Sequence, residues 1–316
     1  MKYQFYTADV FTNQIFSGVQ ITVFPTADGL TDNQMRSIAR EFITPEVVFV
    51  FASQNENSRR IRIFNSLSEL KFGSHSTVAT AYVLASIGDI KLEGEHTKFI
   101  FDSKSGEISV SVTQKDGKPV LTQLSCSITP KVDSYVPTEA EIADILSIDV
   151  NDIENKKYQT LLVSCDTPYL IVPLRRYDLV RKAKFSYRAW SRSQAPTLLA
   201  QELLVFSPVA SSSKVNFHAR LFGPIIGVND DPPIGAAIPA FVGFLCAHKH
   251  VRKGTHTFVA ERGVSTGRIS TLNVEMDNLQ QEQISIRVGG PAVMVAQGTI
   301  EVPEETTTQM LDKAVG

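Results

Sequence analysis

The feature that most constrains the fold of this chain is a pattern that occurs twice, about 160 residues apart. Each copy contains Arg-x-Phe, an acidic residue, a short turn and an apolar run, and the copies begin at Arg62 and Arg220. Internal similarity of this kind predicts two domains related by duplication. In each copy the turn precedes a helix, whose free N–H groups and positive dipole end attract an anion. Two such helix starts facing one cleft would hold a small carboxylate.

Composition bounds the classes of function. The 316 residues are 43% hydrophobic and 20% charged with a net charge of −2, so we expect neither a concentrated basic face nor a nucleic-acid partner. No stretch approaches the ~18 uninterrupted apolar residues of a membrane span, and the N-terminus reads as a strand rather than a signal peptide. Three cysteines without a CxxC pair fit reduced thiols. We therefore expect a cytoplasmic protein without membrane contact.

Strands dominate the predicted secondary structure. Residues 76–87 and 236–247 read as helices without a polar face, which are stable only when other elements surround them. Surface helices are predicted over 31–41, 138–146 and 185–201. Alternation of apolar and polar residues predicts strands over 3–11, 19–24, 46–52, 60–64, 98–102, 107–113, 119–127, 159–164, 169–172, 202–208, 215–222 and within 284–301.

These elements predict an α+β fold with two similar domains. Each domain is expected to be a β-sheet curled around one central buried helix, with the active-site cleft between the domains. The predicted boundaries are residues 1–128 for the N-terminal domain and 129–300 for the C-terminal domain. A polar tail, residues 301–316, is expected to pack back on the N-terminal domain.

Three ionisable residues are candidates for chemistry. Glu46 stands at the start of an apolar strand, where desolvation would raise its pKa toward a range useful in proton transfer, although such an acid is more often simply solvated. His75 lies beside the predicted anion-binding turn, where it either contacts a ligand or is a core residue. Asp231 lies in a proline-rich turn, where the alternative is a capping role.

No cofactor or metal site is predicted. His248-x-His250 with His256 has no carboxylate or cysteine at a helpful spacing. Neither GxGxxG nor GxxxxGK[ST] occurs, so nucleotide binding has no support. We expect a protein that works without either.

Five motifs follow one another along nearly the whole chain. They are Asp9-Val10-Phe11-Thr12 with Phe16-Ser17-Gly18, then Glu46, then Glu69-Leu70-x-Phe72-Gly73-Ser74-His75, then Gly227-Val228-x-Asp230-Asp231-Pro232, and last Glu261-x-Gly263-x-x-x-Gly267-Arg268-x-Ser270. In this order they resemble the motifs of the phenazine-biosynthesis PhzF-like family. The resemblance implies a diaminopimelate-epimerase-like fold, a homodimer, and proton transfer without a cofactor. It also implies Glu46 as general acid/base, with Asp231 and His75 as further active-site residues.

The chain departs from the family pattern where substrate contacts are expected. Val19 and Val47 stand where the family has polar residues, and Ile234 and Ala236 replace two hydroxyl residues. Each lost hydrogen bond weakens binding of a polar group by about 1 kcal/mol. We therefore expect apolar walls from these four residues. The substrate-binding surface is completed by residues of the two helix starts, which are Gly73, Ser74, Ser76, Gly235 and Ala237.

The predicted function is a cofactor-independent isomerase of specialised metabolism. It transfers a proton on a carbon acid or enamine-type small molecule of apolar or aromatic character. Because the helix starts carry no cysteine pair, a two-thiol racemase is excluded. Two alternatives stay open: a cyclase or lyase that acts on an apolar natural-product intermediate in the same cleft, and a non-catalytic binding or assembly protein.

Overall fold

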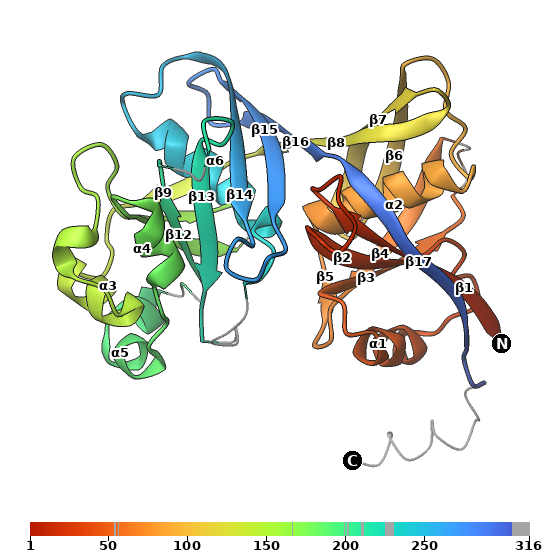
Figure 1. The fold of residues 1–316 in the computed structure, drawn as a ribbon, viewed down its shortest axis with the longest axis horizontal. Helices are drawn as coiled ribbons and strands as arrows, with labels where there is room; N and C mark the ends of the chain where they lie inside the picture. Colours follow the sequence, from red (N-terminus) through yellow and green to blue (C-terminus); the bar gives the residue numbers. More distant parts are fainter. Residues whose placement is uncertain are drawn as a thin grey trace.

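The computed structural model describes residues 1–304 except 54, 56, 166, 199, 201, 210, 211 and 225–230. Figure 1 shows two groups of elements, one from each half of the sequence, with long strands running between them. The N-terminal half contains β1 (Lys2–Val10), β2 (Val19–Phe24), α1 (Asp32–Glu41), β3 (Glu46–Phe51), β4 (Ser58–Phe64), β5 (Glu69–Leu70), α2 (Ser74–Ser86), β6 (His96–Ser103), β7 (Gly106–Lys115) and β8 (Lys118–Ile128).

The remaining elements, which include short 3₁₀ helices, belong to the C-terminal half of the sequence. They are β9 (Lys131–Asp133), α3 (Glu139–Leu146), η1 (Val150–Asp152), β10 (Leu161–Ser164), β11 (Pro168–Pro173), α4 (Tyr177–Lys182), α5 (Tyr187–Arg192), η2 (Ala195–Leu198), β12 (Glu202–Ser207), β13 (Phe217–Phe222), η3 (Gly235–Ala237), α6 (Ile238–Ala247), β14 (Gly254–Arg262), β15 (Ser270–Asn278), β16 (Ile284–Gly290) and β17 (Ala292–Glu301). The strand content confirms the expected α+β class. The hairpin β14–β15 is an addition to the predicted strands, and the helix expected over 185–201 is divided into α5 and η2.

α2 is buried on nearly every side and packs against β1, β2, β7 and β8. Its small side chains permit this close packing. The buried hydroxyls of two threonines are satisfied inside the helix, because Thr77 donates to the carbonyl of Gly73 at 2.8 Å and Thr80 to that of Ser76 at 2.7 Å. In the other half α6 packs against β9, β10 and β11, and its Pro239 stands in the first turn, where proline is tolerated.

The two halves repeat one strand arrangement. β2 and β3 are parallel and β3 pairs antiparallel with β4, while β11 and β12 are parallel and β12 pairs antiparallel with β13. Val47 faces Phe64 in the first half, and Leu203 faces Phe222 in the second. β3 is therefore the counterpart of β12, and position 46 is the counterpart of position 202.

The repeated Arg-x-Phe motif has a structural role in both halves. The guanidinium of Arg62 lies 5.2 Å from the ring centre of Phe64 and binds Asp32 at the start of α1. The guanidinium of Arg220 lies 4.6 Å from the ring centre of Phe222 and donates to carbonyls at the end of α4. Each arginine thus attaches a surface helix to its sheet.

The last strand crosses to the first half. β17 pairs antiparallel with β1 from Lys2–Glu301 to Val10–Ala292, and β16 pairs with β8. Residues 292–300, predicted for the second domain, therefore lie against the first half, where they cover an edge that β1 would otherwise expose. The domain division itself stays a prediction. Of the predicted tail, Pro303 accepts a hydrogen bond from Gln34 at 2.8 Å, and residues 305–316 lie outside the described residues.

A clamp connects the loop after β1 to the loop before β15. The guanidinium of Arg268 donates to the buried carboxylate of Asp9 at 2.6 Å and to the carbonyl of Gly18 at 3.2 Å. Gly18 donates in turn to the carbonyl of Ile269 at 2.9 Å. Position 18 requires glycine, because its φ is +65° and an added Cβ would lie only 2.3 Å from the carbonyl oxygen of Val10. The first and last sequence motifs are therefore held together by this clamp.

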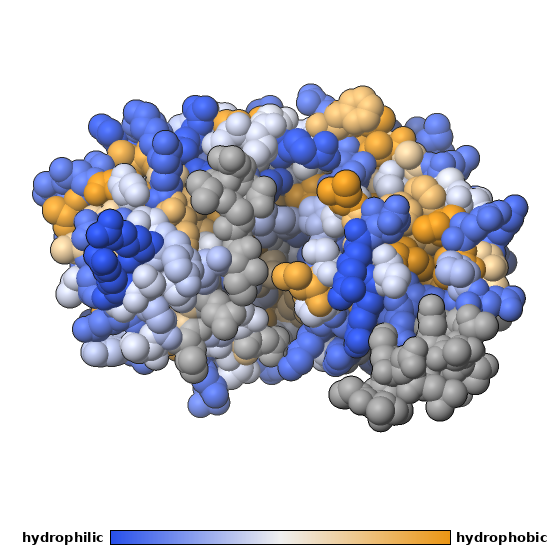
Figure 2. All heavy atoms as spheres, turned by 90° about the horizontal axis from the view of Figure 1, so that it is seen from below, coloured by the Kyte–Doolittle hydropathy of each residue, from blue (hydrophilic) through white to orange (hydrophobic). Residues whose placement is uncertain are grey.

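Hydrophilic and hydrophobic residues are interspersed on the face that Figure 2 shows. Within the described part of the chain, no helix has the length and apolar character needed to cross a membrane.

Candidate active site

A cavity of about 560 Å³ lies between the two halves. Its walls include Pro45, Glu46 and Phe72 from the first half and Tyr169, Glu202 and Ala236 from the second. Prolines, leucines, alanines and Phe72 make up much of the lining, and carboxyl groups interrupt it. The cavity is thus mainly apolar with a few polar groups, which is the usual character of a small-molecule site.

The carboxyl group of Glu46 lies against the start of α2. The hydroxyl of Ser76 donates a short hydrogen bond to Glu46 Oε2, and a Cβ on Gly73 would lie only 2.8 Å from the same oxygen. Burial raises the pKa of Glu46, while hydrogen bonds from the side chain and backbone of Ser76 act in the opposite direction. The helix start that was predicted to bind an anion therefore binds the protein's own carboxylate.

The two predicted helix starts contact each other directly. A Cβ on Gly235 would lie 2.0 Å from Ser74 Oγ and 2.4 Å from His75 Nδ1, and Ser74 and His75 are themselves buried. There is no room for a ligand carboxylate between the two turns at this point. Gly73 and Ser76 border the Glu46 carboxylate, whereas Ser74 and Gly235 form the contact between the halves.

We expect Gly235→Ala to destabilise the protein by about 1–3 kcal/mol, because the added methyl group must displace Ser74 and His75. Ala236→Ser is the matched control, since residue 236 is exposed and lines the cavity. Chemical denaturation of both variants measures the difference. A Gly235→Ala protein as stable as Ala236→Ser would contradict the close contact.

His75 is a buried neutral imidazole. Its ring lies edge-on to Phe11 with centres 4.8 Å apart, and its Nε2 has no hydrogen-bond partner among the described residues. Burial, with a smaller contribution from the charge of Arg262, lowers the pKa of His75 to about 3. His75 is adjacent to the Glu46 site but does not line the cavity.

Asp231 is buried in an interaction with the loop after β14. Its Oδ2 accepts from the N–H of Gly263 at 3.0 Å, and its Oδ1 lies 3.6 Å from Nε of Arg262. The side chain does not line the cavity. Residues Gly227, Val228 and Asp230 of the same motif lie outside the described residues.

The apolar residues predicted to contact the substrate are divided between the cavity and the core. Ala236 lines the cavity, while Val19, Ile234 and Ala237 are buried in the hydrophobic cluster around α2 and α6. Val47 is buried in another cluster with Phe24 and Phe49. Because neighbouring residues of a strand point to opposite faces, Val47 cannot share the direction of Glu46.

Glu202 and Tyr169 line the same cavity, and sequence reasoning did not select them. They are register partners on β12 and β11, and a side-chain hydrogen bond joins them. Burial raises the pKa of Glu202, against the effect of the hydrogen bond from Tyr169. The signal that could have identified Glu202 is the repeat itself, since Glu46-Val-Val-Phe-Val-Phe and Glu202-Leu-Leu-Val-Phe-Ser begin equivalent strands.

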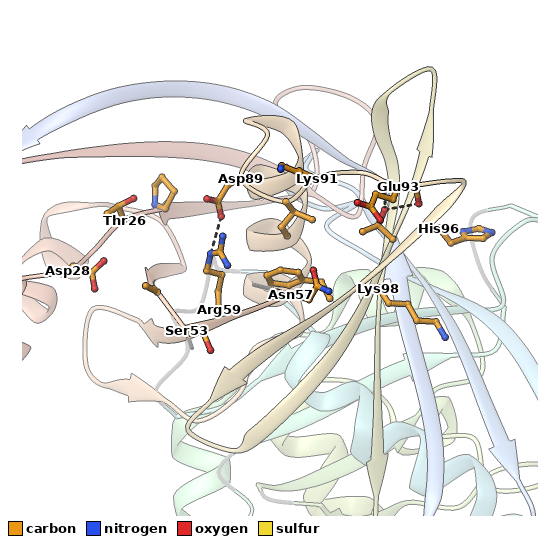
Figure 3. A pocket seen from close by; sticks show the side chains of 15 residues that line it. Thr26, Asp28, Ser53, Asn57, Arg59, Asp89, Lys91, Glu93, His96 and Lys98 are labelled. Atoms are coloured by element: carbon orange, nitrogen blue, oxygen red, sulfur yellow. Dashed lines mark hydrogen bonds and ion pairs between the residues drawn. The ribbon is translucent and has the colours of Figure 1, made fainter. Parts of the chain in front are cut away.

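A larger cavity, about 760 Å³, lies on the N-terminal half and is shown in Figure 3. Its lining carries charges of both signs, including an Arg59–Asp89 ion pair at 3.2 Å. None of the predicted site residues lines it, and it is formed by one half alone. Within the described residues, no group of three or more His, Cys, Asp or Glu side chains is placed to hold a metal ion. The cavity containing Glu46 is therefore the candidate active site.

Comparison with known proteins supports the family resemblance of the sequence motifs. The family model described as phenazine biosynthesis-like protein, PhzC-PhzF, matches residues 8–298. An uncharacterized isomerase of Clostridium acetobutylicum is 28% identical over 93% of this chain and 96% of its own length. The trans-2,3-dihydro-3-hydroxyanthranilate isomerase of Pseudomonas aeruginosa is 22% identical over 94% and 98%. The crystal structure of a Bacillus anthracis phenazine biosynthesis protein of the PhzF family has a TM-score of 0.81 at 20% identity, covering 96% of this chain and all of that one.

Proposed function

This chain belongs to the phenazine biosynthesis-like family and is an isomerase, and we propose that it moves a proton between two carbons of a small substrate by acid/base catalysis at Glu46. The observation that carries the proposal is the position of Glu46. Its carboxyl group is on the wall of an inter-half cavity, and burial raises its pKa. A general base works best when its pKa approaches the working pH.

The residues around Glu46 support both of its protonation states. The ionised form, held by the hydroxyl and N–H of Ser76, removes a proton from an activated carbon. The protonated form, favoured by burial, then returns a proton to the product. The fixed position against α2 means that the base needs little rearrangement when substrate arrives. No cofactor is required for a proton transfer of this kind.

The cavity supports a substrate that is mainly apolar with few polar groups. Phe72, Leu221 and Pro239 contribute apolar surface, while Asn65, Lys71 and Thr167 offer donors. A dihydroaromatic or enamine-type acid of specialised metabolism fits this mixture, and the Pseudomonas relative is named for such a compound. A homodimer and a cytoplasmic location stay predictions.

The test is a reaction in D₂O with trans-2,3-dihydro-3-hydroxyanthranilate, followed by proton NMR and mass spectrometry. We expect conversion with one solvent deuterium placed on carbon. Absence of both conversion and exchange, with this compound and with a panel of cyclic and unsaturated amino acids, would count against the proposal.

A cyclase is the second candidate, and the apolar lining of the cavity is the observation that favours it. A pericyclic reaction forms its product without taking a proton from solvent. Product without deuterium in the same experiment would therefore support the cyclase.

A further inference from the structure

Glu202 occupies the position in the second half that Glu46 occupies in the first. Each is the first residue of a six-residue strand, and each strand lies between one parallel and one antiparallel neighbour. The residue that follows each glutamate faces the phenylalanine of the repeated Arg-x-Phe motif. The repeated strand arrangement thus places one glutamate at the start of the equivalent strand in each half.

Both carboxyl groups border one space. Glu46 and Glu202 line the same 560 Å³ cavity, and the other titratable groups among the described residues of its wall are Glu69, Lys71, Cys165 and Tyr169. Tyr169 is influenced by both glutamates. Burial raises the pKa of its hydroxyl, and the negative charges of Glu202 and Glu46 raise this pKa further. A group influenced by both carboxylates lies within electrostatic range of each.

Glu202 differs from Glu69, another carboxylate among the described residues of the cavity wall. Glu69 is held by Arg62 at 2.8 Å and by Lys104 at 3.3 Å, so its charge is already neutralised. Within the described residues, the structure records no ion pair for Glu202, whose hydrogen-bond partner is the neutral Tyr169. Burial without a cation leaves its carboxyl group able to hold or release a proton.

We propose that Glu202 is the second acid/base group of this site, acting on the substrate from the C-terminal half of the molecule as Glu46 does from the N-terminal half. This inference rests on the proposed isomerase function and changes one step of it, because Glu202, and not the protonated Glu46, returns a proton to the substrate. It also names the class of substrate. The substrate would be a conjugated or carbonyl-activated carbon acid whose two reacting positions face different walls of the cavity.

The proposed step balances within the substrate and the two side chains. Glu46 as carboxylate takes a proton from one carbon, and the electron pair of that C–H bond moves into the conjugated system of the substrate. Glu202 as carboxylic acid gives its proton to a second position, where the displaced electron pair forms the new C–H bond. The substrate is isomerised, and the two carboxyl groups exchange protonation states, which solvent then resets.

The first test uses trans-2,3-dihydro-3-hydroxyanthranilate in D₂O with wild type, Glu202→Gln and Glu202→Asp. We expect Glu202→Gln to lower kcat about 10²-fold or more with KM changed little. Exchange of the proton that Glu46 removes should continue although conversion stops, because only the delivering acid is lost. Glu202→Asp should recover part of the activity. Unchanged kcat in both variants would overturn the proposal, as would equal loss of exchange and conversion in a folded Glu202→Gln protein.

The second test needs no turnover, so it separates this inference from the proposed function. Protein labelled with ¹³C at the glutamate carboxyl carbons is titrated by NMR, and the Glu202 signal is assigned by its loss in Glu202→Gln. Glu46→Gln should lower the pKa of Glu202, because a like charge that borders the same cavity has been removed. Glu107→Gln, at an exposed glutamate on β7, is the matched control and should leave that pKa unchanged. Equal pKa values of Glu202 in Glu46→Gln and Glu107→Gln would overturn the proposal even if wild type isomerises its substrate.

Discussion

Replacing Glu46 by Gln should lower kcat by about 10² or more and at the same time make the protein more stable above neutral pH. The loss of rate follows from removal of the acid/base group. The gain in stability follows from its raised pKa, since the folded state holds a proton that the unfolded state releases near the ordinary value of 4.5. The free energy of unfolding therefore falls as pH rises through the interval between these two pKa values, and Gln removes that dependence.

Steady-state kinetics and thermal unfolding at about pH 8 measure both effects on the same preparation. Glu107→Gln removes one negative charge at an exposed position and should change neither property. Undiminished activity of the Glu46→Gln protein would show that another group carries out the proton transfer. If every variant and wild type lack turnover, a binding or assembly role becomes the better interpretation.

Acid should destabilise the protein through His75 by about 3 kcal/mol between neutral pH and about pH 4. The pKa of His75 is lowered from 6.5 to about 3, so the unfolded state binds a proton in this interval and the folded state does not. Stability is therefore lost as pH falls below 6.5, at about 1.4 kcal/mol for each unit. Among the described residues, His75 has no carboxylate partner to reverse the effect, and its Nε2 accepts or donates no hydrogen bond.

Urea denaturation at several values between about pH 7 and pH 4 tests this expectation. His75→Asn should flatten the decline relative to wild type, whatever its stability at neutral pH. His96→Asn is the control, because His96 is exposed on β6. Parallel stability curves for wild type and His75→Asn would show that His75 binds a proton as readily in the folded protein as in the unfolded chain.

Local sequence rules predicted the elements that position the site. The strand over residues 19–24 follows from alternation, and the apolar run after Gly73 identifies α2 as buried. Glu46 was found because a single acid begins an otherwise apolar strand. In each case the relevant signal lies within about a dozen residues.

The features that sequence reasoning missed depend on distant contacts. Val47 was placed at the substrate although its strand directs it into the core with Phe49, away from Glu46. Glu202 was overlooked because its significance comes from the counterpart strand in the other half. The pairing of Asp231 with Gly263 and Arg262 likewise joins a turn to a strand end that no local pattern connects.

The pairing of β1 with β17 has a consequence for how the chain is made. Lys2 pairs with Glu301 and Val10 with Ala292, so β1 is synthesised long before β17, the strand with which it pairs. The nascent N-terminal half cannot complete its sheet during this time and carries an open strand edge until β17 emerges. Such high contact order slows folding, and it makes the interval before β17 emerges the time when this protein most needs protection from aggregation.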